Sequence, residues 1–208
     1  MASISLSSLV LWCLGAFLCG SVPFGLLLVK LAGKGDVRAH GSGNIGATNV
    51  SRVGGKALGI LTLLLDILKG FLPVFLAKQL GLGESILSLL ALAAVLGHVF
   101  TPWLKFQGGK GVATALGVAL AFRVAMVLPA LGVFLVLMLA FRYVSLGSVM
   151  AAAALPVTLV WMGATPLVIL LWFGIVLVVI LKHHENIRRL LKGTESPLWG
   201  AKKEDAHG

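Results

Sequence analysis

Long apolar segments separated by short polar connections constrain this chain more than any other feature of its sequence. Apolar runs of about 20 residues are long enough to cross a hydrocarbon core roughly 30 Å thick. Within lipid, the backbone groups of each run must pair with one another, so each run should form a helix. We therefore predict an all-α, polytopic integral membrane helix bundle with seven transmembrane helices. The apolar segments are residues 4–29, 57–80, 85–104, 112–122, 124–141, 146–162 and 166–182.

The fourth segment is the weakest of these, because it is short and only Arg123 separates it from the fifth. Five or six spans therefore remain possible. The first segment follows no positive charge and is too long for the core of a signal peptide, so we interpret it as a span. The composition agrees with a membrane protein, since 59% of the residues are hydrophobic and 12% are charged, too few to cover a soluble domain. We expect a single membrane domain over residues 1–208.

The basic residues predict how the spans are oriented. With the C-terminus in the cytoplasm, the N-terminus of a seven-span chain lies outside. All but three of the 17 Lys and Arg residues, the exceptions being Lys69, Lys78 and Arg123, then fall on the cytoplasmic side. A polar loop at 33–56 and a tail at 183–208 are both cytoplasmic in this arrangement. The formal charge of +10 therefore faces anionic lipid and anionic substrates, and we expect no nucleic-acid partner.

The first polar cluster lies in the cytoplasmic loop at residues 41–52, where glycines alternate with hydroxyl, amide and guanidinium side chains. Glycine permits unusual backbone angles and the close approach of a ligand. The side-chain donors suit a phosphate or a carboxylate. A flexible linker of small residues is the alternative, but a linker would not need these donors. The expected binding residues are Ser42, Asn44, Thr48, Asn49 and Arg52.

The second cluster is a glycine-rich phosphate loop at residues 105–114, next to an apolar segment. Glycines around a lysine form an anion cradle, because backbone N–H groups, a helix N-terminus and an ammonium group face one ligand. A plain turn is the alternative. A Walker A loop is excluded by the leucine at 104 and the glycine at 111, so ATP is not inferred. The expected ligand groups are Gly108, Gly109, Lys110, Gly111 and Thr114.

The third cluster begins the tail, where His183 and Asn186 share one face of an expected helix. A histidine acts as a base or a donor near neutral pH, and an amide orients a hydroxyl group. The alternative is a basic helix that binds lipid headgroups, a role that we expect for Arg188, Arg189 and Lys192. Both interpretations of His183 and Asn186 stay open at this point.

Two charged residues, Asp66 and Lys69, lie inside the second apolar segment. An intramembrane charge is costly unless it is paired or faces a polar cavity. We expect the two charges to neutralise each other, with direct chemistry as the alternative. His98 is expected to be a packed, hydrogen-bonded residue rather than a ligand. Cys13 and Cys19 point to different faces of one helix, so neither a disulfide nor a metal site is expected.

Taken together, these motifs resemble those of the bacterial acyl-phosphate:glycerol-3-phosphate acyltransferases, the PlsY family. The resemblance covers nearly the whole chain in the right order, and three long motifs together are highly specific. The matching segments are residues 42–50 with Arg52, 66–70, 97–98, 106–114, and His183 with 185–187 and 189–190.

The resemblance implies a compact, multi-pass protein of the bacterial inner membrane whose active site opens to the cytoplasm. It implies a reaction that moves the acyl group of a long-chain acyl phosphate onto the 1-hydroxyl of glycerol 3-phosphate. The products are lysophosphatidic acid and phosphate, in an early step of phospholipid synthesis. Glycerol 3-phosphate, acyl phosphate and membrane lipid are the expected partners, and no metal or nucleotide cofactor is expected. We expect a monomer.

The resemblance also assigns roles to the clustered residues. Ser42 and Arg52 are expected to hold glycerol 3-phosphate, while the glycines around Lys110 hold the acyl phosphate, with Lys110 also counted as catalytic.

His183 and Asn186 are expected to orient the glycerol near the attacked carbonyl. A serine between the fifth and sixth spans belongs to the family's site, and Ser145 matches better than Ser148. Glu195 completes the expected substrate-binding set. The proton of the attacking hydroxyl needs an acceptor, and both His183 and the substrate's own phosphate are candidates.

Other classes of protein explain less of the sequence. Acyltransferases that use acyl thioesters carry His-x₄-Asp, and no histidine here is followed by aspartate at that spacing. The donor is therefore expected to be acyl phosphate. A small anion transporter is the main rival, but we find no internal repeat, and the polar clusters lie at one face instead of the bilayer midplane. A lipid-scaffolding protein would explain the basic tail but not the glycine-rich loops.

Overall fold

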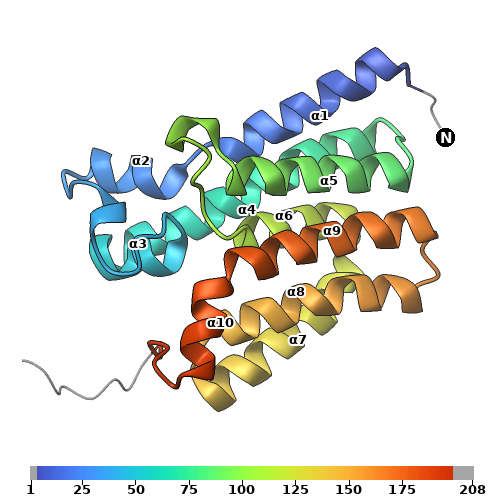
Figure 1. Ribbon diagram of the computed structural model, residues 1–208. Helices are drawn as coiled ribbons and strands as arrows, with labels where there is room; N and C mark the ends of the chain where they lie inside the picture. Colours follow the sequence, from blue (N-terminus) through green and yellow to red (C-terminus); the bar gives the residue numbers. More distant parts are fainter. Residues whose placement is uncertain (1–3, 199–208) are drawn as a thin grey trace, which may run out of the picture.

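The computed structural model describes residues 4–198, and within this range every regular element is a helix. Figure 1 shows the longer helices running roughly along one direction as a bundle. The expected all-α architecture is confirmed for this part of the chain. In chain order the elements are α1 (Leu6–Ser21), α2 (Phe24–Leu31), η1 (Val37–Ala39), α3 (Ala47–Gly54), α4 (Lys56–Gln79), α5 (Glu84–Val99), η2 (Pro102–Leu104), α6 (Val112–Phe122), α7 (Val124–Phe141), α8 (Val144–Trp161), α9 (Pro166–Lys182) and α10 (His184–Leu191).

Five segments of the described range are long and apolar enough to cross a membrane. They are α1 with α2, α4, α5 with η2, α7, and α8. α9 and α10 pass the same test as a pair, although the chain bends by 59° between them. α6 is apolar but has only 11 residues. The chain is therefore a helical membrane bundle with five or six apolar spans, and the seventh predicted crossing depends on α6.

Some boundaries differ from the sequence prediction in ways that affect the site. The glycine-rich loop ends at Gly111, so Thr114 lies in the first turn of α6. Ser145, expected in a turn, lies at the start of α8. The predicted tail contains the helix α10, and its last residues, 199–208, lie outside the described range.

The first predicted span is two helices, because Pro23 interrupts it. Proline has no N–H to donate to a helix, so α1 ends at Ser21 and α2 begins just after the proline. The break frees backbone carbonyls inside the bundle, where each needs a donor. Thr101 Oγ1 donates to the Ser21 carbonyl at 2.7 Å, and Lys69 Nζ donates to the Val22 carbonyl at 2.7 Å. Side chains of other segments thus stabilise the break.

Two glycines bring pairs of helix backbones into direct contact. A Cβ atom at Gly97 of α5 would lie 2.0 Å from the Phe17 carbonyl oxygen of α1. One at Gly117 of α6 would lie 2.0 Å from the Ile67 carbonyl oxygen of α4. Small residues permit this close approach, which contributes strongly to helix association in membranes. The connection that leaves α5 and enters α6 is thereby held between rigidly packed helices.

The C-terminal end of α6 joins the ends of α4 and α5. Lys78 Nζ donates to the carbonyl oxygens of Ala121 and Phe122 at 3.1 and 2.8 Å. These carbonyls belong to the last turn of α6, where no intrahelical donor is available. Arg123, which separates α6 from α7, forms an ion pair with Glu84 at the start of α5. The short helix α6 therefore reaches this end of the bundle.

The expected neutralisation of Asp66 by Lys69 is confirmed, because Lys69 Nζ lies 2.7 Å from Asp66 Oδ1 and both side chains are buried. His98 is packed in the bundle as expected, but its Nδ1 makes no hydrogen bond to any residue in the described range. The expectation of a hydrogen bond is therefore wrong for this nitrogen. Cys13 and Cys19 are both free thiols.

Candidate active site

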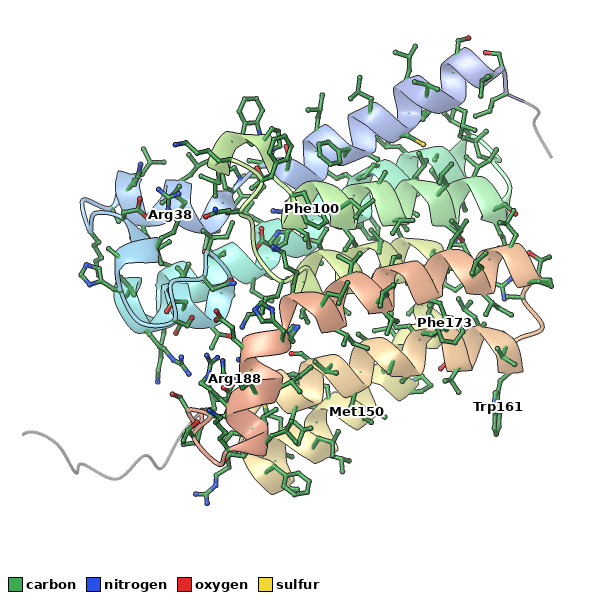
Figure 2. The ribbon with its side chains drawn as sticks, in the orientation of Figure 1. Arg38, Phe100, Met150, Trp161, Phe173 and Arg188 are labelled. Atoms are coloured by element: carbon green, nitrogen blue, oxygen red, sulfur yellow. The ribbon has the colours of Figure 1, made fainter. Side chains whose placement is uncertain are left out.

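The polar clusters, which are far apart in the sequence, meet at one end of the bundle. Figure 1 shows four segments at this end: the loop before α3, the connection before α6, the start of α8 and the whole of α10. The turns that join α4 to α5 and α8 to α9 lie at the opposite end. Figure 2 shows nitrogen- and oxygen-bearing side chains gathered at the end that carries Arg38 and Arg188, whereas apolar side chains surround Phe173. One site can therefore draw on all three motifs.

Asn49 shapes the first motif by binding its backbone. Its side chain is buried, and its Nδ2 donates to the carbonyl oxygens of Val37, His40 and Asn44 at distances of 2.9 to 3.1 Å. Its Oδ1 accepts the N–H of Ser42 at 2.9 Å. The amide is thus fully engaged by the loop. The sequence predicted Asn49 as a binding residue, but this placement makes it a framework residue.

The other predicted residues of the first motif are more accessible. Asn44 Oδ1 accepts the N–H of Gly46 at 2.8 Å just before α3 begins. Thr48 is half-buried on α3, and Arg52 is exposed near the end of the same helix. Burial is the main reason that the pKa of Lys110 is lowered, and the charge of Arg52 contributes in the same direction. Arg52 and Lys110 therefore lie at the same end of the bundle.

The glycine-rich loop folds against the end of α5. The N–H of Gly108 donates to the Val99 carbonyl at 3.0 Å, and that of Gly109 donates to the His98 carbonyl at 3.2 Å. A Cβ atom on Gly109 would lie 2.2 Å from His98 Nε2, so a larger residue does not fit. Gly111 has a φ of 84°, which L residues rarely adopt, and α6 follows at once. The first N–H groups of α6 have no intrahelical acceptor and are free for an anion.

Hydrogen bonds join the second motif to the third. Lys110 Nζ donates to Asn186 Oδ1 at 2.5 Å, and Asn186 Nδ2 donates to Glu195 Oε1 at 2.6 Å. Ser145 Oγ donates to the same carboxylate oxygen at 2.6 Å. Arg189 Nε donates to the other oxygen at 2.7 Å. The glycine-rich loop, α8 and α10 are thereby connected through one carboxylate.

Arg189 is a site residue that the sequence reasoning missed. It was assigned to lipid headgroups, but its guanidinium is bound to Glu195, so that assignment is wrong. A glutamate shortly after a basic helix was the available signal.

The choice of Ser145 agrees with the geometry, because Ser148 is buried one turn further along α8 and makes no hydrogen bond within residues 4–198. The N–H of Leu198 donates to the carbonyl oxygen of Arg142 at 2.8 Å, so the last described residue contacts the turn between α7 and α8.

His183 lies at the junction of α9 and α10, where it is buried. Its Nδ1 lies 2.8 Å from the Val179 carbonyl oxygen, and because a carbonyl only accepts, we assign the proton to Nδ1. Nε2 then carries a lone pair. Burial lowers the pKa of His183 to about 4, opposed by the hydrogen bond to Val179 and assisted by the charge of Lys110. The imidazole is therefore neutral at pH 7.

Burial and pairing set the charges of the network. Burial lowers the pKa of Lys110 from its ordinary value, while the neighbouring Glu195 carboxylate opposes this change. Burial alone would raise the pKa of Glu195, but hydrogen bonds from Ser145, Asn186 and Arg189 outweigh it and the pKa is lowered. Glu195 is therefore ionised at neutral pH and accepts from all its donors.

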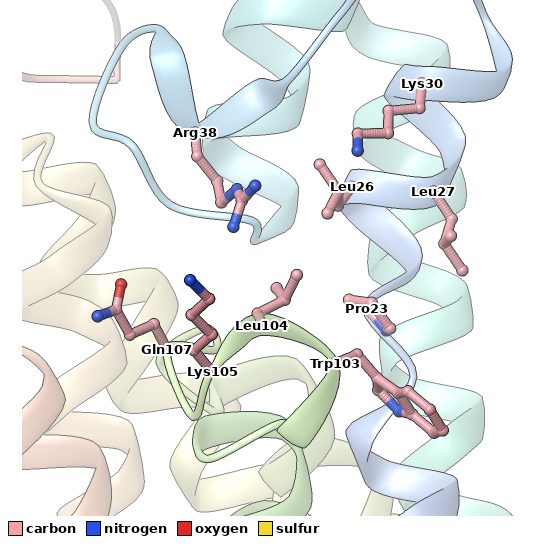
Figure 3. Close-up of a pocket in the computed structure, with 9 residues that line it drawn as sticks. All are labelled: Pro23, Leu26, Leu27, Lys30, Arg38, Trp103, Leu104, Lys105 and Gln107. Carbon is pink, nitrogen blue, oxygen red and sulfur yellow. The ribbon is translucent and has the colours of Figure 1, made fainter.

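A groove of about 480 Å³ lies between α2, η1 and η2 and is lined in part by the first residues of the glycine-rich loop (Figure 3). Lys30, Arg38 and Lys105 give it a basic lining, and Leu27 and Trp103 contribute apolar surface. None of the residues predicted for the site lines this groove. The groove is therefore a neighbour of the site and not its centre.

The donors gathered at this end suit an anionic ligand. Lysine, arginine, amide and hydroxyl groups predominate, and charge-assisted hydrogen bonds from such groups bind phosphates and carboxylates. Among residues 4–198, no group of three or more histidine, cysteine, aspartate or glutamate side chains is placed to hold a metal ion.

Comparison with known proteins identifies the family. The family model described as glycerol-3-phosphate acyltransferase matches residues 10–193. The chain belongs to the glycerol-3-phosphate acyltransferase family. The glycerol-3-phosphate acyltransferase of Trichlorobacter lovleyi is 55% identical over 185 residues, which cover 89% of this chain and 95% of that protein. The one of Geobacter sulfurreducens is 51% identical over 87% of this chain and 93% of the relative.

Solved structures agree with this membership. A crystal structure of PlsY, an integral membrane glycerol 3-phosphate acyltransferase, in its glycerol 3-phosphate form has a TM-score of 0.88 and 42% identity, covering 93% of this chain and 96% of that one. The lysophosphatidic acid form of PlsY has a TM-score of 0.84 at the same identity, over 91% and 95% of the two chains. The resemblance inferred from the motifs is confirmed. The protein is an integral membrane acyltransferase of the PlsY type.

Two serines of α8 provide a matched test of the hydrogen-bond network. Ser145→Ala removes a hydroxyl that donates to Glu195, whereas Ser148→Ala removes a buried hydroxyl without such a bond. A hydrogen bond to a charged group contributes about 1.5 to 3 kcal/mol, so Ser145→Ala should lower kcat/KM about 10- to 100-fold. Ser148→Ala should stay within about twofold. Steady-state acyltransferase kinetics measure both variants, and equal losses would contradict the role given to Ser145.

The protonation of His183 is testable by direct titration. Its pKa of about 4 lies below the ordinary value of 6.5, so the imidazole stays neutral in the folded protein as the pH falls through 6.5. The unfolded chain takes up this proton first, so the group destabilises the fold increasingly between pH 6.5 and 4. NMR of ¹³C-histidine-labelled protein without substrate, with His183→Gln for assignment, should show a midpoint near 4. A midpoint near 6.5 would refute the assigned environment.

Proposed function

We propose that this acyltransferase moves the acyl group of a long-chain acyl phosphate onto the 1-hydroxyl of sn-glycerol 3-phosphate, forming lysophosphatidic acid and phosphate. The observation that carries the proposal is that Arg52 on α3 and Lys110 just before α6 lie at the same end of the bundle, each within a motif suited to an anion. Two anionic reactants need two such cations close together if they are to be held in a reactive arrangement. The glycerol 3-phosphate and lysophosphatidic acid forms of PlsY support the acceptor and the product.

The first motif binds the acceptor in this proposal. Arg52 is exposed at this end of the bundle, and its guanidinium matches two oxygens of a phosphate at once. Ser42 and Thr48 add hydroxyl groups, and Asn44 adds an amide, from the same motif. Asn49 keeps the loop in shape without touching the substrate.

The second motif binds the phosphate of the donor. The N–H groups of Gly108 and Gly109 are already bonded within the protein. These glycines therefore contribute by letting the loop backbone pack closely against His98, where a side chain would not fit. The free donors are the N–H groups that follow, from Lys110 through Gly111 into the first turn of α6. Lys110 adds a full charge that burial makes more effective. Thr114 has a buried hydroxyl with no hydrogen bond in the described range, and it completes the set.

The chemistry needs few further groups. The 1-hydroxyl oxygen attacks the acyl carbonyl carbon, the bond from that carbon to the phosphate oxygen breaks, and phosphate leaves. Acyl phosphate is already activated, so the scheme uses no covalent enzyme intermediate, metal or nucleotide. The hydroxyl proton passes to His183 Nε2 or to the substrate's own phosphate. A bound phosphate raises the pKa of His183 from its low value in the free protein, which brings it closer to that of a general base.

In this proposal, Asn186 and Ser145 orient the reactants with the capacity that their bonds to Glu195 leave, which is the second N–H of the Asn186 amide and the lone pairs of the Ser145 oxygen. Glu195 lies behind them. Both carboxylate oxygens of Glu195 are occupied by protein donors, and a carboxylate repels phosphate. We therefore assign Glu195 to positioning Asn186 and Ser145, in place of the substrate contact inferred from the sequence.

For the membrane arrangement, we propose a single domain of seven crossings with the N-terminus outside and the C-terminus in the cytoplasm of a bacterium. The contacts of Lys78 with the end of α6 support α6 as the fourth crossing, with the glycine-rich loop supplying the remaining length. The basic residues of the loop at 33–56 and of the tail from 183 onward support the orientation. The protein then acts as a monomer in the inner membrane with its site facing the cytoplasm.

The function is tested by mixing the purified protein with palmitoyl phosphate and glycerol 3-phosphate. Phosphate release and formation of lysophosphatidic acid should both occur. Arg52→Ala and Lys110→Ala each remove the charge that holds one reactant, so each should lower kcat/KM by about 100-fold or more. Palmitoyl-CoA should not replace palmitoyl phosphate.

Arg188→Ala is the matched control, because Arg188 is exposed on α10 and has no side-chain partner within residues 4–198. Its activity should stay within about twofold. Turnover of palmitoyl-CoA without turnover of palmitoyl phosphate would overturn the assigned donor. If His183→Ala keeps most of kcat and only raises KM, the substrate phosphate is the base.

The orientation is tested by cysteine labelling. In a background of Cys13→Ala and Cys19→Ala, single cysteines replace His40 in the first motif loop and Gln79 at the end of α4, both exposed. A membrane-impermeant maleimide added to spheroplasts should label Gln79→Cys directly and His40→Cys only after permeabilisation. The reverse pattern would invert the proposed topology.

A further inference from the structure

A buried polar cluster lies directly behind the glycine-rich loop. Asp66 and Lys69 of α4 and His98 of α5 are 2%, 3% and 4% exposed. Asp66 Oδ1 lies 2.7 Å from Lys69 Nζ and 3.9 Å from His98 Nδ1. Burying titratable groups costs free energy even when they are paired, and inside a membrane such groups usually serve a function. The chemistry proposed above uses none of the three.

His98 contacts the glycine-rich loop in two ways. Its carbonyl oxygen accepts the N–H of Gly109 at 3.2 Å. Its imidazole lies against the same residue, because a Cβ atom on Gly109 would come within 2.2 Å of Nε2. Gly108 is equally close, since a Cβ atom there would lie 2.0 Å from the His98 carbonyl oxygen. The loop backbone is therefore supported by both the main chain and the ring of His98.

Asp66 is placed to hold the orientation of that ring. Nδ1 of His98 makes no hydrogen bond within residues 4–198, and the Asp66 carboxylate faces it. A separation of 3.9 Å is too long for a hydrogen bond, so the attraction is electrostatic. We assign the imidazole proton to Nδ1, which faces the carboxylate, so the attraction is between a charge and a dipole. Water does not weaken it, because both groups are buried. Rotation of the ring away from Asp66 would leave a buried nitrogen without any polar neighbour, which is costly.

Lys69 forms an ion pair with Asp66 and also contacts the backbone at the break in the first span. Its Nζ pairs with Asp66 and donates to the Val22 carbonyl at 2.7 Å. It also lies 5.7 Å from the centre of the Phe24 ring. The cluster therefore connects the α1–α2 break, α4 and α5 to the glycine-rich loop.

We propose that Asp66 and His98 are positioning residues for the donor half of the site. Asp66, held by Lys69, orients the His98 imidazole, and His98 keeps Gly108 and Gly109 in the shape that binds the donor phosphate. Neither residue touches the reacting atoms. The inference rests on the function proposed above, and it implies a selective effect. Binding of the donor phosphate depends on the cluster, whereas binding of glycerol 3-phosphate at the first motif does not.

Two substitutions of His98 test the proposal. His98→Leu keeps a side chain of similar volume but removes the nitrogen that faces Asp66. His98→Asn keeps a donor near the Nδ1 position but removes the part of the ring under Gly109. Each variant should raise the KM for palmitoyl phosphate and the inhibition constant of inorganic phosphate by about tenfold or more, with the KM for glycerol 3-phosphate within about twofold.

Controls separate this role from a general loss of stability. Ser88 is buried near the other end of α5, where it accepts a hydrogen bond from Trp172 at 3.2 Å. Ser88→Ala should lower the midpoint of thermal unfolding without changing inhibition by phosphate. The pair Asp66→Asn with Lys69→Met removes both charges together, which avoids an unpaired buried lysine, and should reproduce the kinetics of His98→Leu.

The possible outcomes are distinct. An unchanged inhibition constant for phosphate in either folded His98 variant, or an equal rise in the KM values of both substrates, overturns the positioning role. If His98→Leu does not fold, His98→Asn decides the question by the same measurement. If the unsubstituted protein itself neither uses palmitoyl phosphate nor binds inorganic phosphate, the proposed function fails instead.

Discussion

The carboxylate of Glu195 is the interaction on which the candidate site depends. It accepts hydrogen bonds from Ser145 on α8 and from Asn186 and Arg189 on α10, and Asn186 extends the connection to Lys110. A poorly solvated carboxylate is stable only with such donors, and the donors are held in one arrangement only because the carboxylate is present. The glycine-rich loop and α10, which begins directly after His183, are thereby held in one arrangement. Three segments of the chain are thus joined through this one charge.

The membrane explains why the site lies at one end of the bundle. Inside lipid every polar group must be paired, and the interior of this protein obeys that rule at the Asp66–Lys69 pair and at the break before Pro23. At the end of the bundle, polar groups do not all need a partner within the protein, because water can bind them there. Loops can leave backbone N–H groups free, and the glycine-rich loop reaches inward only as far as His98. The polar groups of the candidate site are therefore gathered at the end of the bundle.

Much of the fold was predictable because hydropathy is a local property of the chain. All the predicted apolar segments are helical, and the neutralisation of Asp66 by Lys69 followed from the cost of an unpaired charge in lipid. The break in the first span was not predicted although Pro23 is a signal for it, because the hydropathy is continuous across the proline and does not reflect the missing N–H. Arg189 and Asn49 were assigned the wrong surroundings for another reason. An arginine beside the membrane and an asparagine in a glycine-rich loop have the same sequence environment whether they face ligand, lipid or protein.

The sequence by itself determined that this chain is a helical membrane protein of the glycerol-3-phosphate acyltransferase family, and which short segments carry its polar chemistry. Only the tertiary structure decided which side chains of each segment are bonded within the protein and which are left accessible. In the fold, Asn49 forms hydrogen bonds with the backbone of its own loop, and Ser145 donates a hydrogen bond to Glu195, which is 50 residues away in the sequence. The physical reason is that the direction of a side chain depends on how distant helices pack, and the close backbone contacts at Gly97 and Gly117 set that packing.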